Sequence, residues 1–281
     1  MRLWFAAACI SLTLLPIPVQ GQPEEDRHGH EAEQNPYEAG PQPKVQPGPL
    51  RPRVVAKDGM VHIAGGTYYM GPADRKAKPR GPIHVPPYWL DRTEVTVAAY
   101  RACVERGECE RPSKTSTRCT FDQGDNELPV SCVRWRDADT YCRKASKRLP
   151  AESEWEFAAR GVTGAQYPWG GGIGQCRYAA TLMGDRHFGK PCTKGPVRVG
   201  TYASGASSFG ALDLSGNVEE WVSDWFTEKP GVVPPSSGAS HVLRGGSWLS
   251  PPSWAKSTSR SYGSAMEAGP TVGFRCARDD H

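Results

Sequence analysis

The pattern of hydrophobic positions divides the chain near Met60. Residues 22–59 are rich in Pro, Glu, Gln and Gly and contain few apolar side chains. Such a segment cannot bury enough apolar surface to offset the entropy lost on ordering. We therefore expect a disordered linker over residues 22–59 and one folded domain over residues 60–281.

The first part of this domain alternates between apolar and polar positions. The alternation over residues 60–71 ends on Gly71 and predicts a strand followed by a turn. Residues 88–95 predict a second strand.

Three segments with helical spacing follow these strands. Residues 97–105 predict a helix that ends near Gly107, and residues 137–147 predict another. Residues 150–160 predict a third helix, because Pro and acidic residues open it and Gly161 follows it. Beyond Gly161, Gly, Pro, Ser and Trp dominate and long periodic runs are few, which indicates a large, loop-rich domain.

Composition narrows the classes of function. The chain has 281 residues, a formal net charge of +4 and no block of Lys and Arg, so a nucleic-acid partner is not expected. No segment after the N-terminal region is apolar enough to span a membrane.

The N-terminus has the features of a secretory signal peptide, which we place at residues 1–21. A positive start at Met1-Arg2 precedes an apolar run over residues 3–15, too short to cross a bilayer. Small residues near Gly21 suit a cleavage site. We therefore expect an exported protein that is periplasmic, on the cell surface or secreted. A lipoprotein modified at Cys9 is the rival interpretation.

The nine cysteines are consistent with export. Cys9 lies in the signal segment, and either processing route leaves eight cysteines for pairing. An even number in an exported chain predicts disulfides. Zinc is the competing interpretation, but the chain has no Cys-x-x-Cys pair.

An ordered series of motifs runs through the folded part of the chain. It begins with Ala64-Gly-Gly-Thr-Tyr-Tyr-Met-Gly71, Asp91-Arg-Thr-Glu-Val-Thr96, Val130-Ser-Cys-Val-Arg-Trp135 and Lys147-Arg-Leu-Pro-Ala-Glu-Ser-Glu-Trp155. It continues with Tyr167-Pro-Trp-Gly170, Gly210-Ala-Leu-Asp-Leu-Ser-Gly-Asn-Val-Glu-Glu-Trp221, Leu243-Arg-Gly-Gly-Ser-Trp248 and Gly273-Phe-Arg-Cys-Ala277. This series resembles the formylglycine-generating enzyme (sulfatase-modifying factor) family. The resemblance covers about residues 60–280 and implies a mixed α/β, loop-rich fold related to C-type lectins.

The resemblance implies one disulfide, because the family joins the positions of Cys142 and Cys276. Proximity along the chain suggests the other pairs, although sequence alone leaves their connectivity open. These pairs are Cys103–Cys109, Cys119–Cys132 and Cys176–Cys192.

The resemblance also implies a structural calcium site. Asp213 and Glu220 would supply carboxylate oxygens, and Gly216 and Val218 would supply backbone carbonyls, which suit this hard cation. A turn with ordinary surface acids is the alternative. A second calcium site of the family is not expected, because Ala stands near Tyr178 where an Asn ligand belongs.

The two positions that carry catalytic cysteines in the family hold other residues in this chain. The family's enzymes use oxygen and copper(I) to convert a sulfatase cysteine to formylglycine, with two cysteines after a Gly-Gly-Ser sequence. Ser250 and Ala255 stand at those positions here. Serine is a hard, poorly acidic ligand and alanine offers none, so copper is not expected. We therefore assign no catalytic residue and favour a non-catalytic binding or structural module.

The former substrate groove remains a candidate binding site. Ser247, Trp248 and Trp254 are its candidate residues, and a protein, peptide or glycan is the expected partner. Packing of these tryptophans in the core is the alternative interpretation.

Two enzymatic alternatives stay open. One is an oxidoreductase that converts a sulfatase cysteine to formylglycine with other residues. The other is an oxygen-dependent oxidase on the same scaffold, similar to the iron-dependent sulfoxide synthases. Those enzymes recruit histidines from an additional helical domain that this chain lacks, and the histidines here show no close ligand spacing.

Overall fold

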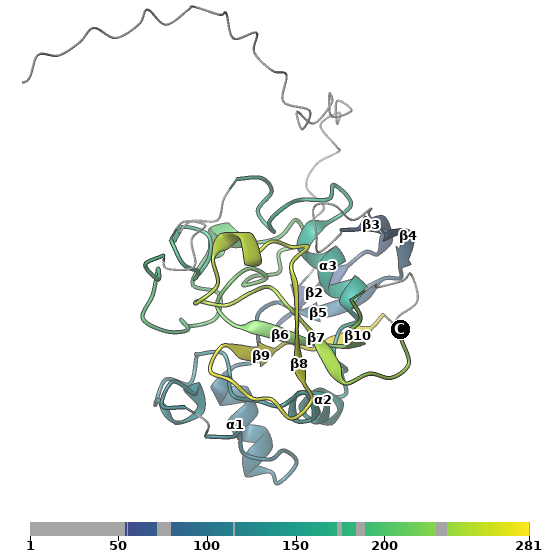
Figure 1. Ribbon diagram of the computed structural model, residues 1–281. Coiled ribbons are helices and arrows are strands. Elements are labelled where there is room, and N and C mark those ends of the chain that lie inside the picture. Colours follow the sequence, from purple (N-terminus) through teal and green to yellow (C-terminus); the bar gives the residue numbers. More distant parts are fainter. Residues whose placement is uncertain are drawn as a thin grey trace, which may run out of the picture. The chain divides into compact units, whose positions relative to one another are not determined.

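The computed structural model describes residues 54, 56–71, 80–114, 116–172, 176–183, 189–228 and 235–280 (Figure 1). The chain divides between Gly48 and Pro49 into two compact units. All described residues belong to the second unit. The predicted signal peptide, Cys9 and nearly all of the predicted linker lie outside the described residues.

One sheet joins the two ends of the described domain. Its antiparallel strands are β1 (Ala56–Lys57), β2 (Met60–Ile63), β5 (Tyr88–Asp91) and β10 (Ala277–Asp279), in the order β1-β2-β5-β10. The first hairpin therefore begins before Met60, inside the segment that we expected to be linker. Asp58 and Gly59 form its two-residue turn with φ of 52° and 74°, as a type I′ turn requires.

The predicted strand over residues 60–71 is two strands in the structure. It breaks after β2, and its second part is β3 (Gly66–Met70), which pairs with β4 (Arg80–Val85) in a separate hairpin. Gly65 enables the break because its φ is 71° and a Cβ there would lie 2.5 Å from the Val85 carbonyl oxygen.

The second sheet carries the C-terminal half of the domain. Its order is β8-β7-β6-β9, and only the β6–β9 pair is parallel. The strands are β6 (Glu219–Trp225), β7 (Ser240–Arg244), β8 (Arg260–Ser264) and β9 (Val272–Phe274).

The three predicted α-helices are present with small shifts. Helix α1 (Val97–Glu105) has the predicted bounds, and the Thr96 hydroxyl caps it by accepting a hydrogen bond from the Ala99 N–H. Helix α2 (Trp135–Lys144) begins and ends earlier than expected, and the Asp137 carboxylate caps its start by accepting a hydrogen bond from the Arg134 N–H at 3.2 Å. Helix α3 (Glu152–Arg160) ends at Gly161, where φ is 63°. Three short 3₁₀ helices are η1 (Thr120–Asp122), η2 (Ala203–Gly205) and η3 (Pro252–Trp254).

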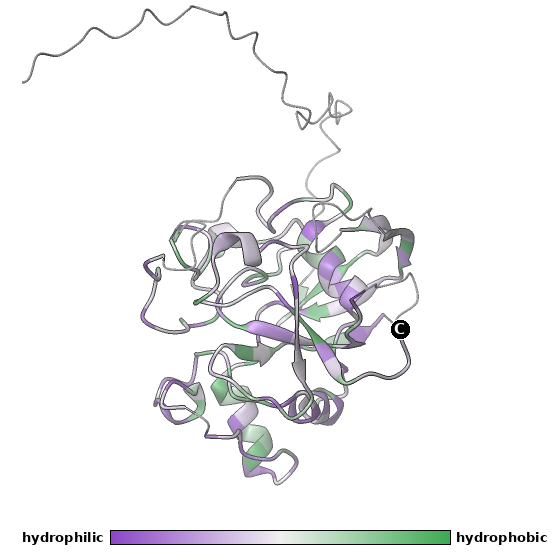
Figure 2. Ribbon diagram, viewed as in Figure 1, coloured by the Kyte–Doolittle hydropathy of each residue, from purple (hydrophilic) through white to green (hydrophobic). Residues whose placement is uncertain are grey.

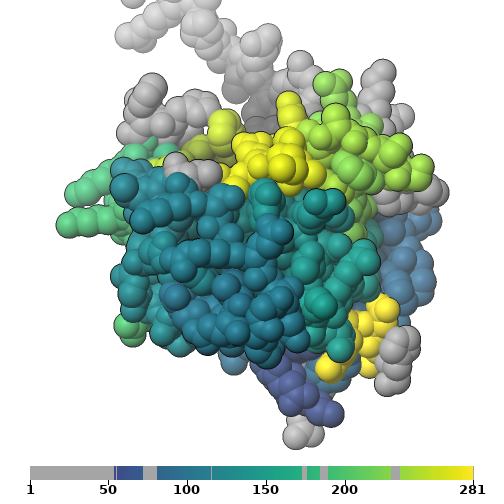
Figure 3. All heavy atoms as spheres, turned by 90° about the horizontal axis from the view of Figure 1, so that it is seen from below, coloured from purple at the N-terminus to yellow at the C-terminus, as the bar shows by residue number. Residues whose placement is uncertain are grey.

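Two hydrophobic clusters hold these elements together. The first lies between α3, the β3–β4 hairpin and both sheets, and includes Tyr88, Phe157 and Val222. The second packs α1 and α2 against β6 and β9 around Trp221 and Phe274. Helix α1 is hydrophobic along most of its length in Figure 2. Figure 3 shows the face of the domain to which the segment around α1, drawn in blue-green, contributes.

Four disulfides tie the loops to these clusters. They join Cys103 to Cys109, Cys119 to Cys132, Cys142 to Cys276 and Cys176 to Cys192, which are the pairs given by the sequence. The Cys142–Cys276 bridge connects α2 to the segment between β9 and β10. No helix among the described residues is long and apolar enough to cross a membrane.

Candidate functional site

Ser247 and Ser250 lie in a closed turn after β7. Gly245 and Gly246 open this turn with φ of 94° and 66°. The Ser247 N–H donates to the Ser250 hydroxyl at 2.9 Å, and the two hydroxyls lie 3.3 Å apart. Both side chains are buried. The Ser250 hydroxyl is therefore occupied in holding the turn.

Ala255 is packed as closely as Ser250. The residue is fully buried, and its carbonyl accepts a hydrogen bond from the Ser215 hydroxyl at 2.7 Å. The Tyr167 hydroxyl donates to the carbonyl of Pro252 in the neighbouring η3 at 3.1 Å. Neither of the two positions that the resemblance links to copper offers a soft ligand.

The cysteines do not compensate for these two positions. All eight cysteines in the described part of the chain are in disulfides. The thiolate is the form of cysteine that ligates copper and reacts as a nucleophile. The described residues therefore provide no thiolate while the disulfides are intact.

A cavity of about 460 Å³ lies beside this turn, and we call it the Trp254 cavity. Trp254 and Tyr262 are 56% and 59% exposed, and both line it. Tyr262 packs on Phe226 with ring centroids 4.2 Å apart. Glu219 lines the same cavity and accepts a hydrogen bond from the Ser261 hydroxyl at 2.7 Å; burial raises the pKa of Glu219.

The three candidate groove residues do not lie together on this surface. Trp254 contributes to the cavity, but Ser247 and Trp248 are only 3% and 2% exposed. Arg118 lies over the Trp248 ring, 5.4 Å from its centroid. Trp248 is thus a core residue, which is the packing alternative given for the tryptophans.

Glu94, Asp213 and Glu220 form a buried acidic cluster around Arg275. Glu220 is fully buried and accepts two hydrogen bonds of 2.7 Å from Arg275 and one of 2.8 Å from the Trp155 indole. Asp213 accepts a hydrogen bond from the Gly200 N–H at 2.6 Å. Both Glu94 carboxylate oxygens are buried without a hydrogen-bond partner among the described residues.

This cluster has more negative than positive groups. Burial raises the pKa of Glu94 well above its ordinary value, and the charges of Asp213 and Glu220 raise it further. Burial also raises the pKa of Asp213 and that of Glu220, the latter against the opposing effect of Arg275. A cation beside Glu94 and Asp213 would stabilise these carboxylates and give the Glu94 oxygens a partner.

Gly216, one of the predicted calcium ligands, stands at a close approach to another part of the chain. Gly216 has a φ of 80°, and a Cβ there would lie 2.2 Å from the Ala180 carbonyl oxygen. Within the described ranges, no group of three or more His, Cys, Asp or Glu side chains has the geometry to hold a metal. The predicted ligands Asp213 and Glu220 both belong to the acidic cluster, and calcium here stays a prediction. Sequence reasoning missed Glu94, although it lies in the quoted motif Asp91–Thr96.

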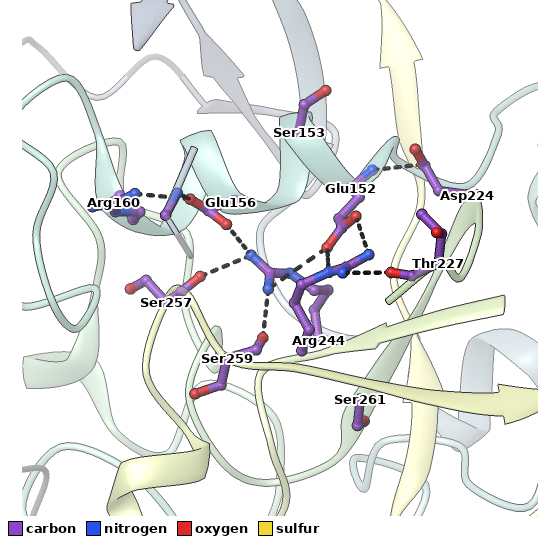
Figure 4. A network of polar contacts seen from close by, with 12 residues as sticks. Glu152, Ser153, Glu156, Arg160, Asp224, Thr227, Arg244, Ser257, Ser259 and Ser261 are labelled. Atoms are coloured by element: carbon purple, nitrogen blue, oxygen red, sulfur yellow. Dashed lines mark hydrogen bonds and ion pairs between the residues drawn. The ribbon is translucent and has the colours of Figure 1, made fainter. Parts of the chain in front are cut away.

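Figure 4 shows an alternating series of charged side chains. The series reaches the Trp254 cavity through Arg260, which lines that cavity. Glu156 bridges Arg160 and Arg244, at 2.8 and 2.5 Å. Arg260 pairs with Glu152 through two nitrogens, and Arg244 lies 3.8 Å from Glu152. Three arginines and two glutamates thus form one network, and no pattern along the chain indicated that they lie together.

The comparison with known families decides the identity of the domain. The family model described as "Sulfatase-modifying factor enzyme 1-like domain" matches residues 47–280. The chain belongs to this family.

Relatives in the sulfatase-modifying factor family include proteins named as enzymes and one named as inactive. The chain is 31% identical to a formylglycine-generating enzyme of Streptomyces coelicolor over an alignment of 305 positions, which covers 86% of this chain and 96% of that protein. It is 35% identical to the mouse protein named "Inactive C-alpha-formylglycine-generating enzyme 2" over 166 positions, covering 54% and 49% of the two chains.

Solved structures confirm the fold expected for the sulfatase-modifying factor family. PvdO from Pseudomonas aeruginosa superposes with a TM-score of 0.63 and 22% identity, covering 78% of this chain and 94% of that one. The domain is therefore a mixed α/β, sheet-rich fold of the formylglycine-generating-enzyme type, related to C-type lectins.

Proposed function

We propose that this chain is a non-catalytic member of its family, an exported module that binds or supports another molecule. The observation that carries the proposal is the closed turn at Ser247 and Ser250. At the position that the family resemblance gives to a copper-binding cysteine, the Ser250 hydroxyl accepts a hydrogen bond of 2.9 Å from the Ser247 N–H. Ala255, at the second such position, is fully buried and has no donor atom in its side chain.

The Trp254 cavity is the proposed binding surface. Its aromatic wall of Trp254 and Tyr262 exposes apolar area beside the hydrogen-bonding groups of Glu219 and Ser261. A mixture of aromatic faces and a few polar groups is typical of sites that bind peptides and glycans. The partner that we propose is a protein, peptide or glycan.

Calcium has a structural role in this proposal. Asp213, Glu94 and the carbonyls of Gly216 and Val218 would hold the ion, and Glu220 would border it while paired with Arg275. When bound, calcium supplies the positive charge that the buried cluster lacks. The ion would thereby hold the loop around Gly216 on the β6 side of the domain.

Export is the third part of the proposal. Disulfides persist in oxidising compartments, and four are present here. They support a periplasmic or extracellular location and agree with the signal peptide inferred for residues 1–21. Detection of the mature N-terminus after Gly21 by mass spectrometry of the exported protein would test this part.

A copper(I) titration tests the non-catalytic assignment. The oxidised protein would compete with a colorimetric copper(I) chelator under anaerobic conditions, beside an active formylglycine-generating enzyme as the positive control. We expect no stoichiometric copper binding, because serine and alanine replace soft thiolates. Binding of one copper equivalent would contradict the proposal and favour the oxidoreductase alternative.

A further inference from the structure

We propose that a second pocket, lined by Arg92 and Arg160, binds a small oxyanion group such as a sulfate, phosphate or carboxylate. This pocket has a volume of about 580 Å³ and a lining different from that of the Trp254 cavity. We call it the Arg92 pocket. Its occupation is independent of whether the domain is catalytic.

The charge of the Arg92 pocket favours an anion. None of the described residues that line it is acidic, and Arg92 forms no ion pair within the described part of the chain. The Arg92 Nε donates only a long hydrogen bond of 3.4 Å to the Gly210 carbonyl. The described residues therefore leave most of the donor capacity of this guanidinium unused.

The second arginine brings surplus positive charge to the same pocket. Arg160 is one end of the network in Figure 4, in which three arginines share Glu152 and Glu156. At the other end, Arg260 is compensated by a two-nitrogen pair with Glu152. Arg160 therefore shares its acidic partner Glu156 with Arg244.

The described residues also leave some hydrogen-bond donors of Arg160 unused. Its Nη1 donates to Glu156 at 2.8 Å and to the Tyr69 carbonyl at 3.1 Å, which holds the guanidinium in place. Its Nη2 makes only a 3.4 Å contact with the Gly164 carbonyl, and its Nε has no partner among the described residues. A held arginine with spare donors suits an oxyanion, whose oxygens accept charge-assisted hydrogen bonds.

Hydroxyl-bearing residues line the same pocket as the two arginines. Thr163, Ser204, Ser207 and Ser208 line the pocket, and the buried Ser207 hydroxyl has no hydrogen-bond partner among the described residues. Ser208 lies close to the end of α3, because a Cβ at Gly161 would lie 2.8 Å from its hydroxyl oxygen. Several hydroxyl donors and two guanidinium groups match an anion with three or four oxygens.

The aromatic side chain of the pocket already has aromatic neighbours. Trp169 lines the pocket, and its ring is stacked against both Tyr167 and Tyr178, with centroids 4.9 and 5.1 Å away. The proposed recognition therefore rests on the arginines and hydroxyl groups rather than on this ring.

Isothermal titration of the mature protein with sodium sulfate, sodium phosphate and sodium acetate tests the proposal. Sodium chloride keeps the ionic strength constant, and the three salts distinguish the possible oxyanions. We expect saturable binding of at least one of them. In Arg92→Gln, the dissociation constant should rise by about tenfold or more, since a charged hydrogen-bond donor is lost.

Two further variants make the result specific. Arg106→Gln removes an equal charge from an exposed position outside the pocket, so its dissociation constant should match that of the wild type. Arg92→Lys keeps the charge but loses the forked donors, and its dissociation constant should fall between those of the wild type and Arg92→Gln. No saturable binding of any salt, or equal weakening in Arg92→Gln and Arg106→Gln, would overturn the proposal.

Discussion

The Ser250 hydroxyl accepts the Ser247 N–H at 2.9 Å in a turn from which water is largely excluded. Ser250→Ala would leave that N–H without its acceptor, so we expect a loss of about 1–3 kcal/mol in the free energy of unfolding. Urea denaturation measures this loss. Ser237→Ala, at an exposed position, is the control and should change stability little. Equal stability of the two variants would show that the Ser250 hydroxyl does not hold the turn.

Glu156 holds Arg160 and Arg244 together in the buried network. Glu156→Gln removes the charge that both arginines share, so we expect a loss of about 3–5 kcal/mol in stability. The control is Glu108→Gln, which affects an exposed pair with Arg106 and should cost about 0–1 kcal/mol. Chemical denaturation of both variants measures the difference. Similar small losses would show that Arg160 and Arg244 do not depend on Glu156.

His241 gives the domain a predictable pH dependence. Its buried ring lies between Trp135 and Trp225, with centroid distances of 3.8 Å to each. Burial lowers the pKa of His241 below its ordinary value of 6.5, although the Asp224 carbonyl opposes this effect. Above pH 6.5 the imidazole is neutral in both states, and its contribution to stability is fully present.

As the pH falls below 6.5, the unfolded chain takes up a proton at His241 before the folded protein does. This difference favours unfolding, so stability is lost until the pH reaches the folded pKa. His241→Phe keeps an aromatic ring between the two tryptophans and removes the titration. The wild type should therefore lose more stability than His241→Phe between neutral and mildly acidic pH. Parallel pH profiles would contradict this prediction.

Calcium should stabilise the wild type through Asp213 and Glu94. At a free calcium concentration about 100 times the dissociation constant, the gain in stability is about 2.7 kcal/mol. A chelator should therefore lower the melting temperature, and Asp213→Asn with Glu94→Gln should abolish the difference. Glu108→Gln should retain it. A melting temperature unaffected by the chelator, with Glu94→Gln more stable than the wild type, would contradict the calcium site.

Local signals predicted several elements of the fold well. The Thr96 cap and Gly107 bracket α1, and both act within a few residues of the chain. The first strand was missed because β1 has only two residues, although the Asp58-Gly59 dipeptide is a strong hairpin signal. The break at Gly65 was missed because it depends on the approach of the Val85 carbonyl, a contact between distant parts of the chain.

The candidate sites show the same limit. The resemblance pointed to Asp213 and Glu220, but it did not reveal that Arg275 engages both Glu220 oxygens. The proximity of Glu94 is likewise a product of folding. The sequence also did not indicate which tryptophan is exposed. Trp248 and Trp254 are close in sequence, yet the first is 2% exposed and the second is 56% exposed.

The most direct test of the non-catalytic assignment is an assay for formylglycine formation. The mature protein, copper(I) and oxygen are incubated with a peptide that contains Cys-x-Pro-x-Arg, and mass spectrometry follows the peptide. An active formylglycine-generating enzyme serves as the control. With Ser250 and Ala255 in place of thiolates, we predict no conversion of the peptide cysteine. Conversion to formylglycine would contradict the account and show that other residues of this chain activate oxygen.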